Sequence, residues 1–139
     1  MKYIGLDLGS VTCGISKSDT GKIAQPVKTM RFKPDDYNAC FDMLLDYFEV
    51  EKPDVIVLGL PLLENGDVGP RAQLCLDFGE ELEKESGIKV VMQDERCTTK
   101  DSLEFLISID MSRKKRKKII DQQAAVRILQ YYLDGLKNK

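Results

Sequence analysis

The stretch that decides the fold is Lys2-Tyr-Ile-Gly-Leu-Asp-Leu-Gly-Ser10, a run of strand-forming residues with one acid, Asp7, inside it. Aspartate is depleted in strands and is almost never fully buried unless it is paired or holds a metal ion. Packing therefore supplies no reason for Asp7. We interpret it as a reactive group, which predicts that other functional groups of the chain meet it.

The composition is that of one globular domain spanning residues 1–139, with 42% hydrophobic and 32% charged residues. A chain of this length buries about two-thirds of its unfolded surface, so neither a metal nor a disulfide is needed to hold it. The sequence has no recognisable secretory signal and no apolar run of about 18 residues, so we expect a cytoplasmic protein without a membrane partner. The four cysteines form no C-x-x-C pair, which argues against a zinc site and a redox motif.

Histidine is absent from the sequence. Its absence excludes Ser-His-Asp and Cys-His catalysis, histidine general bases and histidine-ligated zinc. Acid–base or metal chemistry must therefore come mostly from carboxylates. The basic residues are also unevenly placed: the net charge is −2, yet residues 113–118 hold six of the 21 Lys and Arg side chains. Such a concentration predicts contact with a polyanion at that one place.

The hydrophobic pattern predicts three antiparallel strands followed by alternating helices and strands. The strands of the expected meander are residues 2–8, 11–17 and 27–32. The later elements are a helix from 34 to just before Pro53, a strand at 54–59, a loop at 60–69, a helix from Pro70, a strand at 88–92, a helix from Thr98 to about 110, and a last helix at about 120–136. This order describes an α/β sandwich with a mixed five-stranded sheet and helices on both faces.

Three acidic residues lie at the ends of core elements rather than on solvated faces: Asp7, Glu95 and Asp121. Glu95 follows the strand expected at 88–92, and open α/β sheets place their ligands at the carboxyl ends of parallel strands. Asp121 lies four residues before the apolar Ala125, so it should share the face that the last helix turns to the sheet. Asp121 could instead cap its helix and Glu95 could favour a helix start, but neither alternative explains Asp7.

Three carboxylates in one cleft repel each other unless cations neutralise them. Mg²⁺ is the usual solution, because it is a hard ion that prefers oxygen ligands, and Mn²⁺ is its alternative. Two such ions about 4 Å apart can activate water and stabilise the leaving oxygen of a phosphodiester. The expected site is a two-metal hydrolytic centre, in which Asp7 bridges the metals and Glu95 and Asp121 complete the coordination.

The basic run directly precedes the helix that carries Asp121. Its members are predicted to hold a nucleic-acid backbone beside the carboxylates; they are Arg113, Lys114, Lys115, Arg116, Lys117 and Lys118. Taken alone, such a run is more often a solvated stretch or a disordered arm. The helix start at Gly69-Pro70-Arg71 could add backbone N–H groups to a phosphate site, although a purely structural loop explains it equally well.

Four groups of residues form a specific set when they are taken together and in order. They are Ile4-Gly-Leu-Asp-Leu-Gly9 with Gly14-Ile15 and Ser18-Asp19, Gly59-Leu-Pro-Leu62 with Gly66 and Gly69-Pro70, Asp94-Glu-Arg96 with Thr98-Thr99, and Ser112-Arg-Lys-Lys-Arg-Lys-Lys118 ahead of Asp121 with Ala124-Ala125. The set covers nearly the whole chain and resembles the YqgF/RuvX family. That family is described as Holliday-junction-resolvase-like and as a nuclease for the 5′ end of pre-16S ribosomal RNA.

The resemblance implies a ribonuclease H-like fold with an antiparallel second strand, and action in the bacterial cytoplasm. It also implies that Asp7, Glu95 and Asp121 are the family's metal-binding catalytic acids. One departure is visible after Gly9, where many members carry a basic residue and this chain reads Ser-Val-Thr-Cys-Gly. A substrate contact near Cys13 is therefore expected to be missing.

We thus expect a metal-dependent nuclease that acts on precursor ribosomal RNA, with resolution of branched DNA as the alternative and a homodimer left open. A protein that binds nucleic acid without cutting it is a second hypothesis. A third is an actin-like ATPase or sugar kinase, because Asp7-Leu-Gly-Ser10 resembles the first phosphate loop of those proteins. This third hypothesis is weak, since such proteins need two related domains and a second phosphate loop.

Overall fold

The computed structural model describes residues 1–94 and 113–137, with 113–122 and 137 described by their backbone alone. In chain order the elements are β1 (Tyr3–Leu8), β2 (Thr12–Ser18), β3 (Gln25–Arg31), α1 (Tyr37–Glu51), β4 (Val55–Leu60), α2 (Pro70–Ser86), β5 (Lys89–Asp94) and α4 (Arg113–Lys137). Every predicted strand is present, with bounds that differ from the expected ones by at most two residues. The helix predicted from Thr98 to about 110 lies outside the described residues.

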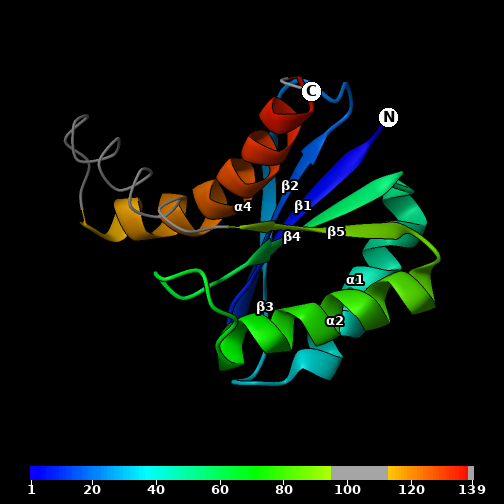
Figure 1. Ribbon diagram of the computed structural model, residues 1–139. Helices are drawn as coiled ribbons and strands as arrows, with labels where there is room; N and C mark the ends of the chain where they lie inside the picture. The colour runs from blue at the N-terminus through cyan, green and yellow to red at the C-terminus, as the bar shows by residue number, and fades with distance from the viewer. Residues whose placement is uncertain (95–112, 138–139) are drawn as a thin grey trace.

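The five strands form one mixed sheet in the order β3-β2-β1-β4-β5 (Figure 1). β1 pairs antiparallel with β2, and β2 pairs antiparallel with β3, so the first three strands are the predicted meander. β4 pairs parallel with both β1 and β5. The predicted mixed sheet is confirmed. β1 is its central strand, and the carboxyl ends of β1, β4 and β5 lie at one edge.

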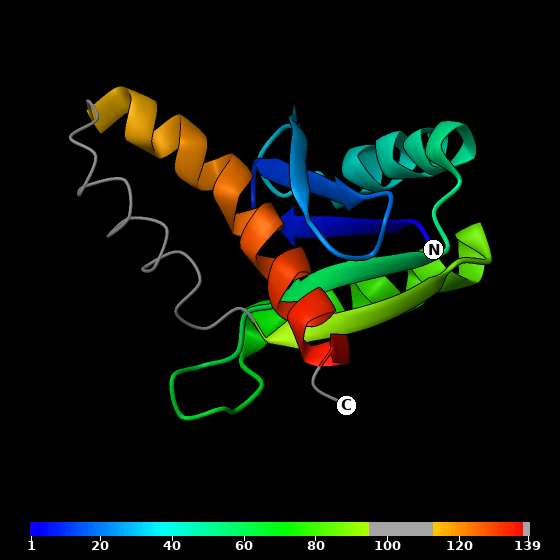
Figure 2. The same cartoon turned by 90° about the horizontal axis from the view of Figure 1, so that it is seen from above.

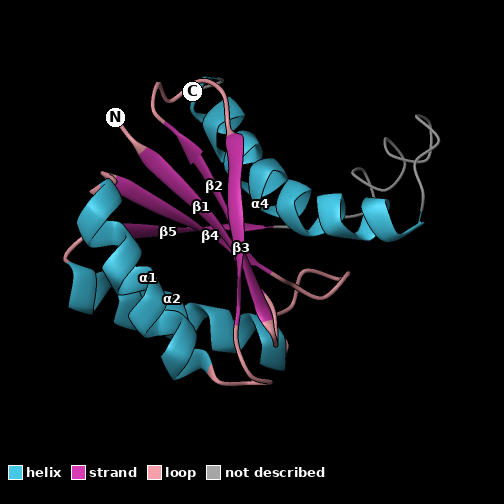
Figure 3. Cartoon of the chain, turned by 180° about the vertical axis from the view of Figure 1, so that it is seen from behind, coloured by secondary structure: helices cyan, strands magenta, loops and turns pink. Residues whose placement is uncertain are grey.

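Helices cover both faces of the sheet, as predicted: α1 and α2 pack on one face and α4 packs on the other (Figure 3). Successive side chains of β1 point to alternate faces. Ile4, Leu6 and Leu8 join the core under α1 and α2, whereas Tyr3 packs with apolar residues of α4. Asp7 shares the face of Tyr3, so the acid of the central strand is on the α4 side.

The helix starts have local causes. Asp36 caps α1, because its side chain accepts a hydrogen bond of 3.2 Å from the backbone N–H of Ala39. Pro70 occupies the first position of α2, where its missing N–H costs nothing. Among the helices described, none has the length and the apolar run that crossing a membrane requires.

The last helix is longer than predicted, because α4 begins at Arg113 rather than at about residue 120. The basic run is therefore part of the helix and not a segment before it. Lys and Arg are good helix formers, and neither Gly nor Pro interrupts residues 113–134. The apolar periodicity that located this helix gives no signal across six consecutive charged residues, which is why the prediction placed the start too late. The first turns of α4 extend past the carboxyl ends of the strands (Figures 1 and 2).

Candidate functional site

Asp7 lies one residue before the carboxyl end of the central strand, and its side chain is half-buried on the α4 face. The residue opposite it on β2 is Gly14. On the other side, Leu6 is opposite Leu58 of β4, and the next residue along β4 is Gly59. Glycine has no side chain, so neither neighbouring strand covers the Asp7 carboxylate with an opposite residue. The sequence signal for this opening was present, since glycine inside a strand often marks the approach of a ligand or another backbone.

The same row of residues continues into β5. Gly59 is opposite Gln93, and Val91, two residues before Gln93, packs in the core on the α4 side. Gln93 therefore also faces α4. β5 ends at Asp94, and Glu95, which follows it, lies outside the described residues. The chain is thus described as far as the residue before Glu95, at the sheet edge where Asp7 lies.

α4 crosses this face in close contact with β1 and β2. Ser16 is fully buried, and its Oγ donates a hydrogen bond of 2.7 Å to the backbone carbonyl of Ala125. A Cβ atom at Gly5 would lie 2.8 Å from the Cβ of Leu129 and 3.1 Å from the carbonyl oxygen of Ala125. Only glycine at this position lets the helix come so near. The contact fixes where α4 lies along β1.

A second set of hydrogen bonds holds α4 to the loop between β2 and β3. The Oε1 atom of Gln130 accepts a hydrogen bond of 2.9 Å from the backbone N–H of Ala24, and its Nε2 donates one of 3.0 Å to the carbonyl of Lys22. The helix is therefore attached at two places, one in the middle of the sheet and one at the edge opposite the site. Both attachments oppose sliding of α4 along the sheet.

Asp121 belongs to α4 and lies one turn before Ala125, but its side chain is not among those described. The same is true of the basic side chains at 113–118. Among the described side chains, no three Asp, Glu or Cys residues come together in a way that could hold a metal ion. Two of the three predicted ligands, Glu95 and Asp121, are outside that set, so the three-carboxylate site stays a prediction.

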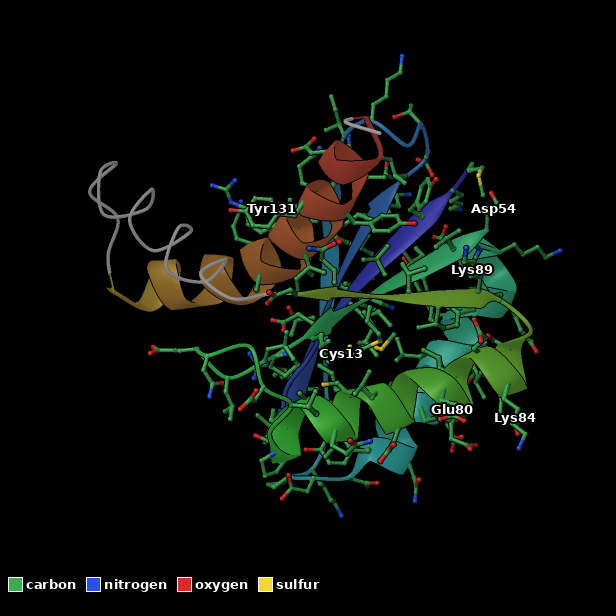
Figure 4. All side chains as sticks on the ribbon, viewed as in Figure 1. Cys13, Asp54, Glu80, Lys84, Lys89 and Tyr131 are labelled. Atoms are coloured by element: carbon green, nitrogen blue, oxygen red, sulfur yellow. The ribbon has the colours of Figure 1, made fainter. Side chains whose placement is uncertain are left out.

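The cysteine nearest to Asp7 in the sheet points away from the site. Cys13 is fully buried on the opposite face, in the core with Cys40 and Cys75 under α1 and α2 (Figure 4). A side-chain hydrogen bond with Cys40 raises the pKa of the Cys13 thiol well above its usual value, and burial and the charge of Asp7 act in the same direction. The thiol therefore stays neutral and contributes to packing. The departure from the family pattern at residues 10–13 does not present this cysteine to a substrate.

The loop between β4 and α2, residues 61–69, is folded on itself. The N–H of Leu63 donates to the carbonyl of Asp67 at 3.0 Å, and the N–H of Gly66 donates to the carbonyl of Leu63 at 2.8 Å. Leu63 also packs against Gly69: a Cβ atom at Gly69 would lie 3.1 Å from the Cδ2 of Leu63. At the start of α2, Arg71 donates hydrogen bonds to protein oxygens. This segment therefore has an internal structural role at the sheet edge where Asp7 lies.

The fold is that of the ribonuclease H-like class, as the resemblance to the YqgF/RuvX family implied, and the mixed five-stranded sheet is the one that the hydrophobic pattern predicted. The chain superposes on RuvC from Thermus thermophilus with a TM-score of 0.62 and 12% sequence identity, covering 99% of this chain and 97% of RuvC. The structure of the same RuvC in complex with a Holliday junction substrate gives a TM-score of 0.61.

The sequence defines the relationship more narrowly. Residues 1–135 match the family described as "RuvX: Holliday junction resolvase", and the chain belongs to this family. It is 43% identical over 136 residues to a protein of Bacillus mycoides (strain KBAB4), covering 97% of this chain and 99% of that protein. It is 45% identical over 135 residues to a protein of Lactococcus lactis subsp. cremoris (strain MG1363), covering 96% and 94%. Both relatives are named "Putative pre-16S rRNA nuclease". The family predicted from the sequence is confirmed.

Proposed function

We propose that this protein is a metal-dependent nuclease that hydrolyses phosphodiester bonds of structured RNA, in the processing of the 5′ end of pre-16S rRNA in the bacterial cytoplasm. The observation that carries the proposal is the half-buried Asp7 at the carboxyl end of the central strand, between Gly14 and Gly59. Membership of the RuvX family and the names of the relatives support the same activity. Resolution of Holliday junctions is the second candidate, favoured by the family description and by the superposition on junction-bound RuvC.

The backbone register of α4 supports a role for Asp121. Tyr3 packs on α4 nearer the C-terminus of the helix, and Gly5 packs on it at Ala125, so residues further along β1 meet earlier turns of α4. Asp7 is two residues beyond Gly5, about 7 Å along the strand. Asp121 is one turn before Ala125, about 6 Å along the helix. The two steps nearly match, so the turn that carries Asp121 is the turn expected over Asp7.

Asp7, Glu95 and Asp121 would hold Mg²⁺ or Mn²⁺, ions whose preferred protein ligands are carboxylate oxygens. Such ions activate water and stabilise a leaving oxygen. The donor chemistry fits, because Asp7 offers carboxylate oxygens at a half-buried position where the opposite residues of both neighbouring strands, Gly14 and Gly59, have no side chain. The protein itself supplies the positioning: β1 fixes Asp7, β5 leads to Glu95, and α4 carries Asp121.

The basic residues at 113–118 would hold the substrate backbone next to these acids. Contacts from Lys and Arg to phosphates position a nucleic acid without reading its sequence, and they make binding strongly dependent on salt. The run occupies the turns of α4 that extend past the sheet edge (Figure 2). A phosphate backbone held there lies on the side of the sheet where Asp7 is found.

The test is cleavage of a labelled precursor-rRNA fragment and of a four-way DNA junction in the presence of Mg²⁺ or Mn²⁺. Asp7→Asn keeps the size of the side chain and removes its charge. We expect it to slow cleavage at least about 100-fold, since even groups that only support a metal ligand change activity about 10–100-fold. Asp46→Asn, at an exposed position of α1, is the matched control and should cleave like wild type. Equal cleavage by wild type and Asp7→Asn would remove the mechanism.

A binding protein without nuclease activity gives a different result. Wild type would then bind both substrates without cutting them, and Asp7→Asn would bind equally well. Replacing the basic residues at 113–118 with Gln weakens binding under either hypothesis and reduces its salt dependence by about one unit of slope for each phosphate that no longer meets a cation. Cleavage by wild type therefore separates the two hypotheses, and the salt titration tests the basic run.

A further inference from the structure

We propose that Arg71 is a positioning residue for the reaction and that it holds the carboxyl end of β1 through a closed ring of hydrogen bonds behind Asp7. This inference rests on the proposed nuclease function, because it assigns a task beside the same site. Arg71 lies in the first turn of α2 and is half-buried. Neither the basic run nor the three acids include it.

The ring is formed by four hydrogen bonds. Arg71 donates from Nη2 to the carbonyl of Leu8 at 2.8 Å and from Nη1 to the Oη of Tyr37 at 2.7 Å. Tyr37 donates from Oη to Oδ1 of Asp35 at 3.1 Å. The backbone N–H of Asp35 then donates to the carbonyl of Ser10 at 2.8 Å. The bonds thus connect the carbonyl of Leu8, the last residue of β1, with the carbonyl of Ser10, two residues later.

The end of β1 is held by pairing with β2 as far as Leu8, but on the β4 side its pairing stops early, and Arg71 supports it there. The last pair between β1 and β4 is Leu6 with Leu58, whereas β1 continues to Leu8. Just past that last pair, the carbonyl of Leu8 accepts a hydrogen bond from Arg71. Asp7 lies between the last pair and the carbonyl that Arg71 holds, so a shift of the strand end would move its carboxylate. Functional groups of a site must be held within about 0.5 Å of their working geometry.

Two features suit the ring to this task. The backbone of Asp35 has φ 59°, a left-handed conformation that aspartate tolerates better than most residues, and it directs the Asp35 N–H to the carbonyl of Ser10. The guanidinium of Arg71 also lies over the ring of Tyr37, 5.8 Å from the centroid. Arginine alone offers a planar fork of donors that reaches two acceptors in fixed directions, which the single ammonium of lysine does not.

The first experiment measures amide hydrogen exchange, which does not depend on catalysis. The variants are Arg71→Met, which removes the donors, and Arg71→Lys, which keeps the charge. The matched control is Arg127→Met, because Arg127 stacks on Tyr131 in the same way, 6.0 Å from the centroid. In Arg71→Met we expect the amides of Gly9, Phe32 and Asp35, which bond within and between the loops at this edge, to exchange at least about 10-fold faster. The exchange of the ladder amides near the middle of β1 should not change.

The second experiment separates positioning from substrate contact. Arg71→Met should lower the single-turnover cleavage rate about 10–100-fold, as loss of a supporting group does, and leave the KM for the RNA within about threefold. Arg71→Lys should fall between Arg71→Met and wild type, and Arg127→Met should match wild type. A raised KM with an unchanged rate would make Arg71 a substrate contact and overturn the proposal.

The two measurements also keep the proposal distinct from the proposed function. If wild type does not cleave, the nuclease function fails, and the exchange rates still decide whether Arg71 holds the strand end. Unchanged exchange at the three loop amides would overturn the ring whatever the activity. Tyr37→Phe removes only the phenol hydroxyl that links Arg71 to Asp35. It provides the same exchange test should Arg71→Met fold poorly. It should accelerate exchange most at Asp35.

Discussion

The two faces of the sheet carry side chains of different size around β1, although the same strands form both faces. The face under α1 and α2 is filled with large aliphatic side chains, such as Leu6 and Leu58, and with buried thiols. The α4 face around β1 has small residues instead: glycine at position 5, where the helix approaches, and glycine at positions 14 and 59, on either side of Asp7. A period of two lets one strand place large aliphatic side chains on one side and the proposed functional acid on the other. The comparison teaches that the α4 face of β1 combines packing, at Tyr3 and Gly5, with the proposed site at Asp7, whereas the opposite face serves packing alone.

The largest effects should come from removing the packing side chain Leu6 and the proposed functional acid Asp7, which are neighbours on β1 and face opposite sides of the sheet. Leu6→Ala leaves a cavity in the core under α1 and α2 and should lower the free energy of unfolding by about 2–5 kcal/mol. Asp7→Asn should change that free energy by less than about 1 kcal/mol while it slows cleavage at least about 100-fold. Urea unfolding measures the stability of both variants, and cleavage assays measure their activity. An Asp7→Asn variant that is destabilised as much as Leu6→Ala would contradict this difference between the two faces.

A smaller effect is expected where the α4 face is packed most closely. Gly5→Ala places a methyl group 2.8 Å from the Cβ of Leu129, so α4 must move outward. Such overpacking should cost about 1–3 kcal/mol of unfolding free energy. The matched control is Gly135→Ala in α4, the helix that Gly5 contacts. An added Cβ there meets nothing within 4 Å, and helix propensity should raise stability by up to about 1 kcal/mol. Thermal unfolding should therefore show shifts of opposite sign, and shifts of the same sign would contradict the close contact at Gly5.

The smallest change in stability is expected at Tyr47, whose polar hydroxyl lies next to the apolar core under α1 and α2. The hydroxyl of Tyr47 on α1 is buried and has no hydrogen-bond partner in the part of the chain that the structure describes. Burial, followed by the charges of Glu51 and Asp19, raises its pKa from 10.0 to about 12. Tyr47→Phe should leave stability at neutral pH unchanged or raise it by about 1 kcal/mol, since no bond is lost.

The pH dependence gives a second readout for Tyr47. Because its pKa is higher in the folded protein, the phenol contributes stability that is fully present below pH 10 and is lost as the pH rises through 12. Urea unfolding at a series of alkaline pH values should show this loss in wild type and a smaller loss in Tyr47→Phe. A curve that is identical in the two proteins would show that Tyr47 ionises as it does in the unfolded chain.

The strands and their layers could be predicted because their patterns are local. Val55–Leu60 is a nearly continuous apolar run, as expected for a parallel strand covered on both faces. Asp7 was found because an acid does not suit a core strand, and its place on the central strand is confirmed. The start of α4 was missed because charged residues carry no periodicity. The convergence of Glu95 and Asp121 on Asp7 stays a prediction, since their side chains are not described.

Contacts between distant parts of the chain were beyond prediction for a physical reason. A glycine in a strand indicates that something approaches, but the partner of Gly5 is a helix more than a hundred residues later in the chain. The hydrogen bonds of Arg71 likewise join residues 34 and 63 positions apart. No local pattern encodes such pairs, because they arise only when the sheet and its helices have packed.

The start of α4 has a consequence for energetics. The helix begins with six cations and has no acidic residue in its first turn. The positive end of the helix macrodipole and the repulsion between side chains one turn apart both oppose these charges. A polyanion held there would relieve both, so under the proposed function we expect the helix to gain stability when nucleic acid binds. Thermodynamic linkage makes the gain reciprocal: the free energy that binding adds to the helix equals the free energy that the formed helix adds to binding.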